Sequence, residues 1–168
     1  MGINNKLIRP FSLFLINNFL KGTHFFGLKR MLMNFSGAHF GANVKLVGPL
    51  EIGSVANFTV EEGCWLGKNL KIDGNGAVYL GRNIDIGPQV TFCTGGHEIG
   101  NSDRRAGRGE TFSQFVGDGC WIGAHSVIVG NTTIGPGCIV AAGSVVVNDS
   151  LPNGLLAGVP AVEKKKLP

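Results

Sequence analysis

The sequence predicts an all-β protein wound as a parallel β-helix of about five triangular coils. Two observations support this fold class. Large apolar residues recur every six positions, and 27 of the 168 residues are glycine. A period of six fits neither an α-helix nor an alternating strand, but it fits a chain that turns a corner after each buried apolar residue. Three such sides close one coil, so fifteen positions make about five coils. The fifteen positions are Phe40, Leu46, Ile52, Phe58, Leu66, Ile72, Leu80, Ile86, Phe92, Val116, Ile122, Ile128, Ile134, Val140 and Val146.

The residues that follow the apolar positions are typical of tight corners. Glycine often comes next, and Asn, Gly or His comes two positions later, as in the segments 67–69, 81–83 and 123–125. Glycine and asparagine tolerate the left-handed backbone region at the lowest cost. A supply of them at a fixed phase explains the glycine excess. It also suggests a coil of unusual hand, since parallel crossovers are otherwise almost always right-handed.

We divide the chain into a helical segment, residues 1–36, and a β-helix domain, residues 37–168. The first segment has little glycine, and residues such as Leu7, Phe11 and Phe14 recur at helical spacing between basic residues. We expect this segment to pack on the body or on a neighbouring subunit. The alternative is a basic amphipathic helix that makes weak peripheral contact with an anionic membrane, which would place the protein at the inner face.

The repeat fails between residues 93 and 115. The positions that continue the period there are Glu98, Arg104 and Glu110, and charged side chains cannot fill the core of a coil. We therefore expect residues 93–115 to form a loop extruded from the coils. Long loops in compact domains are often functional.

The net charge of +4 is modest, and much of it lies in Arg104, Arg105 and Arg108 and in the lysines of residues 164–166. Clusters this small suit one compact polyanion or plain solvation, and they argue against nucleic acid as a partner. The four cysteines form no CxxC pair, so we expect buried thiols in a reducing compartment and no metal site. Without a cleavage signal or an apolar run of about 20 residues, the chain is predicted to be cytoplasmic.

Several motifs together resemble the hexapeptide-repeat acyltransferases, in particular the galactoside, maltose and polysaccharide O-acetyltransferase branch. The likeness covers about residues 40–165. It implies a left-handed parallel β-helix, a homotrimer with active sites between subunits, acetyl-CoA in the groove between coils, and no metal. The motifs are LGRNIDIGPQV at 80–90, TGGH at 94–97, VGDGCWIG at 116–123, IGPGCIVAAGSVV at 134–146 and AGVPA at 157–161.

His97 is the candidate catalytic residue. Acetyl transfer to a hydroxyl needs a base, and an imidazole that titrates near neutrality can take the proton. His97 follows two glycines, so an acceptor can approach it closely. A loop histidine alone is more often structural, but the resemblance implies that His97 is the general base.

The resemblance also implies contacts to the cofactor. Trp121 would lie beside the thioester, the Ala124 N–H would donate to its carbonyl, and Ala142 would meet the pantetheine arm. Lys165 would meet the nucleotide phosphates. Two further candidates are Val147 and Asn148, which stand where many relatives carry Thr-Lys. This chain therefore lacks a lysine at that point.

The acceptor side matches the family less well. Gly67 and Asn75 stand where relatives carry a polar Asn and Asp pair, while Asn69 and Asp85 are nearby polar candidates. We therefore expect the acceptor to be a sugar of a surface polysaccharide (capsule, O-antigen or exopolysaccharide) rather than a simple galactoside or maltose. The alternatives are serine, an antibiotic or a nucleotide-linked amino sugar. A γ-class carbonic anhydrase needs a histidine pair that is missing here, and a non-catalytic β-helix remains open.

Overall fold

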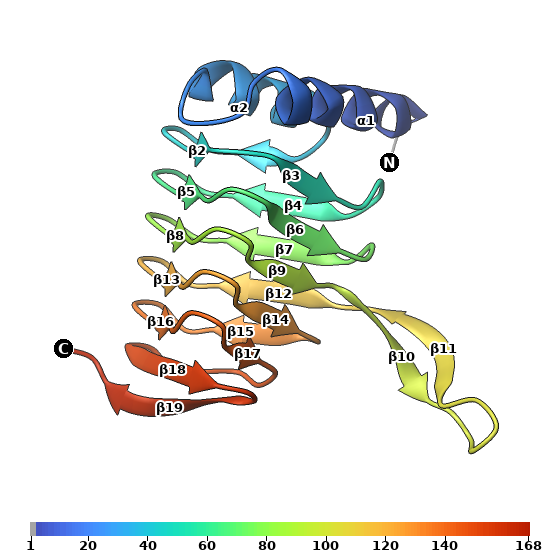
Figure 1. Cartoon of the computed structure of the whole chain (residues 1–168), viewed down its shortest axis with the longest axis vertical. Helices are drawn as coiled ribbons and strands as arrows, with labels where there is room; N and C mark the ends of the chain where they lie inside the picture. The colour runs from blue at the N-terminus through green and yellow to red at the C-terminus, as the bar shows by residue number, and fades with distance from the viewer. Residues whose placement is uncertain (1–2) are drawn as a thin grey trace.

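The computed structural model describes the backbone of residues 3–168 and the side chains of residues 7–168, so residues 1 and 2 of the predicted helical segment lie outside it. Two helices, α1 (Ile3–Asn18) and α2 (Phe26–Phe35), lie across one end of a stack of coils (Figure 1). The predicted left-handed parallel β-helix is confirmed. Five coils are complete, and β18 begins a sixth.

Each coil contributes one short strand to each of three parallel sheets, which we call A, B and C in the order in which the chain visits them. Sheet A holds β1 (His39–Phe40), β4 (Asn57–Val60), β7 (Ala77–Leu80), β12 (Ser113–Val116) and β15 (Thr132–Ile134). Sheet B holds β2 (Lys45–Leu46), β5 (Trp65–Leu66), β8 (Asp85–Ile86), β13 (Trp121–Ile122), β16 (Ile139–Val140) and β18 (Gly154–Gly158), with β19 (Ala161–Lys166) antiparallel to β18. Sheet C holds β3 (Leu50–Ile52), β6 (Leu70–Asp73), β9 (Thr91–Cys93), β14 (Val127–Val129) and β17 (Val145–Val146).

The core consists of columns of apolar side chains along the axis of the stack. Parallel pairing places Leu66 beside Ile86 and Ile86 beside Ile122. Of the fifteen positions predicted from the period, fourteen are buried, and Ile52 is half-buried against the same core. Burial of such side chains stabilises a fold by about 1.5–3 kcal/mol each, so these columns are the main source of stability.

Two steps of the period take eight residues instead of six. They run from Ile52 to Val60 and from Ile72 to Leu80, because Val60 and not Phe58 pairs with Leu80, so both fall on one edge of the triangle. Val60 pairs with Leu80, so that coil takes 20 residues, whereas Val116 pairs with Ile134 and that coil takes 18. The two extra residues lie where sheet C passes into sheet A, at residues 53–56 and 74–76. We call this the C–A edge; in the first coils it takes two residues more between inward positions than the other two edges do.

A long antiparallel hairpin leaves the C–A edge after the third coil, formed by β10 (Gly95–Ile99) and β11 (Ala106–Thr111) (Figure 1). It is shorter than the predicted loop of residues 93–115, because Cys93 belongs to β9 and Ser113–Val116 form β12. Gln114 takes an inward position on β12 beside Val78 and Thr132, so the coil resumes before Val116. Gln114 is 1% exposed, and its Nε2 donates to the carbonyls of Cys93, Ile128 and Gly130 at 3.0–3.1 Å.

The corners have the backbone conformation that their sequence predicts. Non-glycine residues with positive φ are concentrated there, including Asn69 at φ 57° and His125 at φ 59°. Other corner glycines are required by close approach between coils. A Cβ on Gly67 would lie 2.6 Å from the backbone of Gly87, nearer than real Cβ contacts come.

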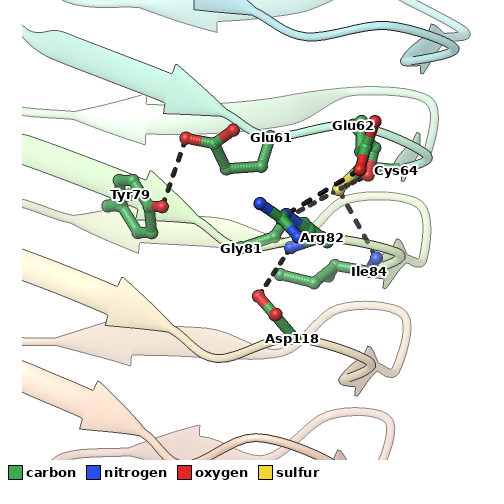
Figure 2. A network of polar contacts seen from close by, with 8 residues as sticks. All are labelled: Glu61, Glu62, Cys64, Tyr79, Gly81, Arg82, Ile84 and Asp118. Atoms are coloured by element: carbon green, nitrogen blue, oxygen red, sulfur yellow. Dashed lines mark hydrogen bonds and ion pairs between the residues drawn. The ribbon is translucent and has the colours of Figure 1, made fainter.

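Polar side chains join the coils where sheet A passes into sheet B (Figure 2). The Tyr79 hydroxyl donates to Glu61 at 3.2 Å, and the Arg82 N–H donates to Asp118 at 2.8 Å. Arg82 Nε also lies 3.8 Å from a carboxylate oxygen of Glu62. These groups are exposed, so we assign them to alignment of the coils rather than to a site.

Three of the four cysteines are buried as expected. Cys64, Cys120 and Cys138 occupy one inward column beside sheet B, and each thiol lies 3.0–3.1 Å from a backbone carbonyl. Burial raises the pKa of Cys120 to about 11. Cys93 is only half-buried. Among the described residues, no group of three His, Cys, Asp or Glu side chains is placed to hold a metal ion.

The helical segment closes the first end of the β-helix with two buried cations. Arg9 and Lys29 are fully buried, and burial lowers the pKa of both. Both side chains donate hydrogen bonds to backbone carbonyls of the first coil and of the helical segment. These carbonyl oxygens would otherwise lack donors, because no further coil precedes the first one. For Arg9 these are the carbonyls of Ser36, Gly53, Ser54 and Ala56, and for Lys29 those of Gly22, Leu46 and Val47.

We predict that Arg9→Met lowers the free energy of unfolding by about 2–4 kcal/mol, because several buried carbonyls lose their donor at once. Urea unfolding of the full chain measures this. The control is Arg30→Met, since Arg30 lies on the same helical layer but is only half-buried. Equal stability of the two variants would show that the carbonyls do not depend on Arg9.

Candidate functional site

His97 lies on β10, the first strand of the hairpin, opposite Gly109 on β11. Its Nδ1 is 3.0 Å from the carbonyl oxygen of Gly107. A carbonyl oxygen can only accept, so this contact requires the proton on Nδ1. The lone pair of Nε2 is then free, and the exposed imidazole is ready to take a proton from a ligand.

The sequence did not indicate Gly107 as the group that orients His97. Glu98, the next residue in the chain, is exposed. Only the register of the hairpin, which pairs Gly95 with Thr111 and His97 with Gly109, brings the Gly107 carbonyl to the imidazole.

His97 opens onto a cleft of about 520 Å³ between the hairpin and the C–A edge of the second coil. The predicted residue Asn75 lines it, together with Asp73 and Glu110, which sequence reasoning missed. The hairpin can lie this close because Gly74 has φ 99°, and a Cβ there would come 2.6 Å from the backbone nitrogen of Gly95.

Asp73 gives the cleft negative character. Its carboxylate lies 3.6 Å from Lys71 Nζ, but both side chains are exposed, so the pair is weak. Burial raises the pKa of the adjacent Cys93 thiol, and the charge of Asp73 raises it further. Carboxylates beside an amide and an imidazole suit a ligand that is rich in hydroxyl groups.

A second groove, of about 380 Å³, joins three of the predicted cofactor residues, Trp121, Ala124 and Ala142. It runs over sheet B at the corner that leads to sheet C and is mainly apolar, with Pro88 among its walls. Trp121 is 57% exposed, so its indole is available to a ligand rather than used in the core.

The other predicted cofactor residues lie outside this groove. Val147 is exposed after β17, and Lys165 is exposed on β19 opposite Leu155. Asn148 lines a separate hollow of about 290 Å³, which also contains the carboxylates of Asp149 and Glu163. Two carboxylates beside Asn148 disfavour a phosphate at that point.

The structure brings only one of the three acceptor candidates to His97. Asn75 lines the His97 cleft. Asn69 lies just before β6, whereas Asp73, which lines the cleft, is the last residue of β6. Four residues of strand, or about 13 Å, therefore separate Asn69 from Asp73. Asp85 lies on β8 of sheet B, directly beside Trp121 on the neighbouring strand β13. Within one chain, Asn69 and Asp85 therefore lie apart from the His97 cleft, because the two corners lie at opposite ends of the strands of sheet C.

The His97 cleft and the Trp121 groove share no lining residue, and they lie at different corners of the triangle. One described chain thus presents a polar cleft with a basic imidazole and, separately, an apolar groove with a tryptophan. Among the described residues, no helix is long and apolar enough to cross a bilayer.

Comparisons with known proteins agree with the repeat. Residues 115–148 match the family described as "Bacterial transferase hexapeptide (six repeats)". The galactoside O-acetyltransferase of Escherichia coli K12 is 33% identical over 123 residues, which cover 73% of this chain and 61% of the relative. The chain therefore spans about three fifths of that protein's length.

Solved structures extend the similarity to the whole chain. A hexapeptide-repeat-containing acetyltransferase from Vibrio cholerae superposes with a TM-score of 0.81 and 24% identity, covering 99% of this chain and 94% of that one. A galactoside acetyltransferase in complex with coenzyme A gives 0.75 and 25%, covering 100% and 84%. An N-acyltransferase from Bacillus cereus, with dTDP and coenzyme A, shares the fold at 0.55 and 16%, covering 78% and 84%.

We predict that neutral His97 carries its proton on Nδ1, because its contact at that atom is a carbonyl oxygen. Long-range ¹H–¹⁵N NMR correlations of the imidazole distinguish the two tautomers. His24, exposed between the two helices, serves as the comparison and should show the ordinary preference for Nε2–H. An Nε2–H form of His97 would contradict the role of Gly107.

Proposed function

We propose that the chain belongs to the hexapeptide-repeat transferases and is an acetyl-CoA-dependent O-acetyltransferase in which His97 removes the proton from a sugar hydroxyl. The observation that carries this proposal is the imidazole itself: Nδ1 faces the Gly107 carbonyl, while Nε2 is free beside a cleft with polar walls. The similarity to a galactoside O-acetyltransferase and to a structure that holds coenzyme A supports the donor and the reaction class.

The reaction balances with one base. The acceptor oxygen attacks the thioester carbonyl as His97 Nε2 takes its proton, which forms a tetrahedral oxyanion. The intermediate then breaks its C–S bond, and the imidazolium returns the proton to the CoA thiolate. The products are the acetyl ester and free CoA, and His97 is again neutral.

The backbone N–H of Ala124 is the proposed donor to the thioester oxygen. It donates to no backbone carbonyl among the described residues, although its neighbours Gly123 and His125 both do. Gly87 leaves it accessible, since a Cβ there would lie 2.6 Å from this nitrogen. An oriented backbone donor stabilises charge that develops on the oxygen during attack.

We propose a homotrimer with sites between subunits, and the separation of the two halves supports it. The His97 cleft lies at one corner of the triangle and the Trp121 groove at another. Three copies around an axis parallel to the coils can place the hairpin of one beside the groove of the next. In this arrangement Asp85 and Asn69 would line the shared site from the second subunit. Lys165, Val147 and Asn148 would lie further along the cofactor.

The acceptor is proposed to be a hydroxyl-rich sugar in the biosynthesis of a surface polysaccharide. Asp73, Asn75 and Glu110 offer several oxygen acceptors for hydroxyl protons, and their negative character disfavours an acidic acceptor. The alternative is transfer to the amine of a nucleotide-linked sugar, which the shared fold of the Bacillus N-acyltransferase keeps open. A cytoplasmic location remains a prediction.

We predict that His97→Ala lowers kcat by about 10²–10⁴-fold and leaves the KM for acetyl-CoA nearly unchanged, because a general base acts mainly in the transition state. Release of CoA with a panel of mono- and oligosaccharides measures this, and serine and amino sugars in the same panel test the alternatives. His24→Ala is the control. Full activity of the His97 variant would remove the proposed mechanism.

We predict that Ala142→Phe raises the KM for acetyl-CoA at least about tenfold by filling the apolar groove, while Ala42→Phe, at an exposed corner of the first coil, has no effect. Co-expression of this variant with His97→Ala then tests whether each site is shared between two subunits. If sites form between subunits, random mixing restores about a quarter of them. If each site forms within one chain, mixing restores none.

A further inference from the structure

The two helices carry an apolar surface on the side that faces away from the coils. On α1, Leu7, Phe11 and Phe14 recur at spacings of four and three and are exposed, at 62% for Phe11 and 54% for Phe14. Arg9 and Ile16, which are fully buried, mark the opposite side of the same helix.

The second helix repeats this arrangement. Leu28, Met31 and Phe35 are exposed, the last at 65%, while Lys29 and Met33 are buried against the first coil. Soluble proteins rarely expose so many large apolar side chains in one region. We call Leu7, Phe11, Phe14, Leu28, Met31 and Phe35 the outer helical face. Figure 1 shows that both helices lie beyond the first coil, at one end of the molecule.

The charge of the chain is concentrated at this end. Residues 1–50 contain six Lys or Arg and no Asp or Glu, whereas residues 51–168 contain nine basic and eleven acidic residues. The first part therefore carries +6 and the second −2. Arg9 and Lys29 lie beneath the outer helical face, where their hydrogen bonds go to backbone carbonyls. Lys21 is exposed on the helical segment, and Arg30 is partly exposed.

We infer that the outer helical face docks on an anionic phospholipid surface, with its aromatic side chains at the boundary between headgroups and acyl chains. Both the apolar side chains and the positive charge favour this surface. Insertion among the acyl chains removes the apolar side chains from water, and each Lys or Arg near an anionic surface adds about 1 kcal/mol of attraction. A second copy is the other occupant of such a face. Two copies would bring two regions of charge +6 together without any carboxylate in either, which disfavours that pairing.

This inference is independent of the proposed acetyl transfer, because none of its residues lines the His97 cleft or the Trp121 groove. It also sharpens the two expectations for residues 1–36. The segment does pack on the β-helix through Ile16 and Met33, yet no other part of residues 7–168 covers the side opposite these contacts. Packing and membrane contact therefore use different sides of the same helices.

Flotation of the full chain with lipid vesicles tests the proposal. We expect binding to vesicles of phosphatidylcholine and phosphatidylglycerol in about equal parts to exceed binding to phosphatidylcholine alone by about tenfold or more. Phe11→Ser with Phe14→Ser should lower binding to the anionic vesicles about tenfold. Lys21→Ala with Arg30→Ala should remove most of the difference between the two compositions.

The control is Leu151→Ser, an exposed leucine near the opposite end of the stack, which should bind as the unaltered chain does. Sedimentation velocity without lipid follows the oligomeric state of each variant, and circular dichroism its fold. Absence of binding to both compositions, or binding that the helical variants do not change, overturns the proposal. A smaller oligomer after Phe11→Ser with Phe14→Ser also overturns it, because the face would then be covered by another copy.

Discussion

Parallel pairing between successive coils forces the residue at each inward position to lie beside its counterpart one coil earlier. Leu66, Ile86 and Ile122 therefore form a column, and a change at any one of them affects two neighbours. The pairing also fixes the corners, where Asn69 and His125 must adopt positive φ for the chain to turn within a few residues. Core, corners and the placement of the site all depend on this register.

The register explains why much of the fold could be predicted from the sequence. A column needs one apolar residue per side, so the period of six is visible in the residue types, and the corner glycines mark its phase. The features that could not be predicted from the period are buried polar and charged side chains. Gln114 occupies an inward position but donates to three carbonyls, so it does not count as part of an apolar period and the extruded segment was expected to be longer than it is. The cap formed by Arg9 and Lys29 was missed for the same reason, because charged residues are not expected inside.

The candidate site also has one part that could be predicted from the repeat and one part that could not. Trp121 and Ala124 lie in the fourth coil, and Ala142 follows Ala124 by one coil of 18 residues, so their common groove follows from the repeat. The surroundings of His97 do not, because they depend on the register of an antiparallel hairpin that no period describes. The Gly107 carbonyl and the carboxylates of Asp73 and Glu110 reach the cleft only through that register. Asn69 looked near to Asn75 in sequence, yet a strand of sheet C separates them.

The hairpin is an addition to the stack and not a part of it. Leu80 on β7 pairs directly with Val116 on β12, so the third and fourth coils are continuous beneath the point where the hairpin leaves. The scaffold and the segment that carries His97 can therefore change independently. A lineage could lengthen, shorten or replace residues 95–111 while every coil keeps its neighbours, and new acceptor preferences could arise without any cost to the solenoid that supports them.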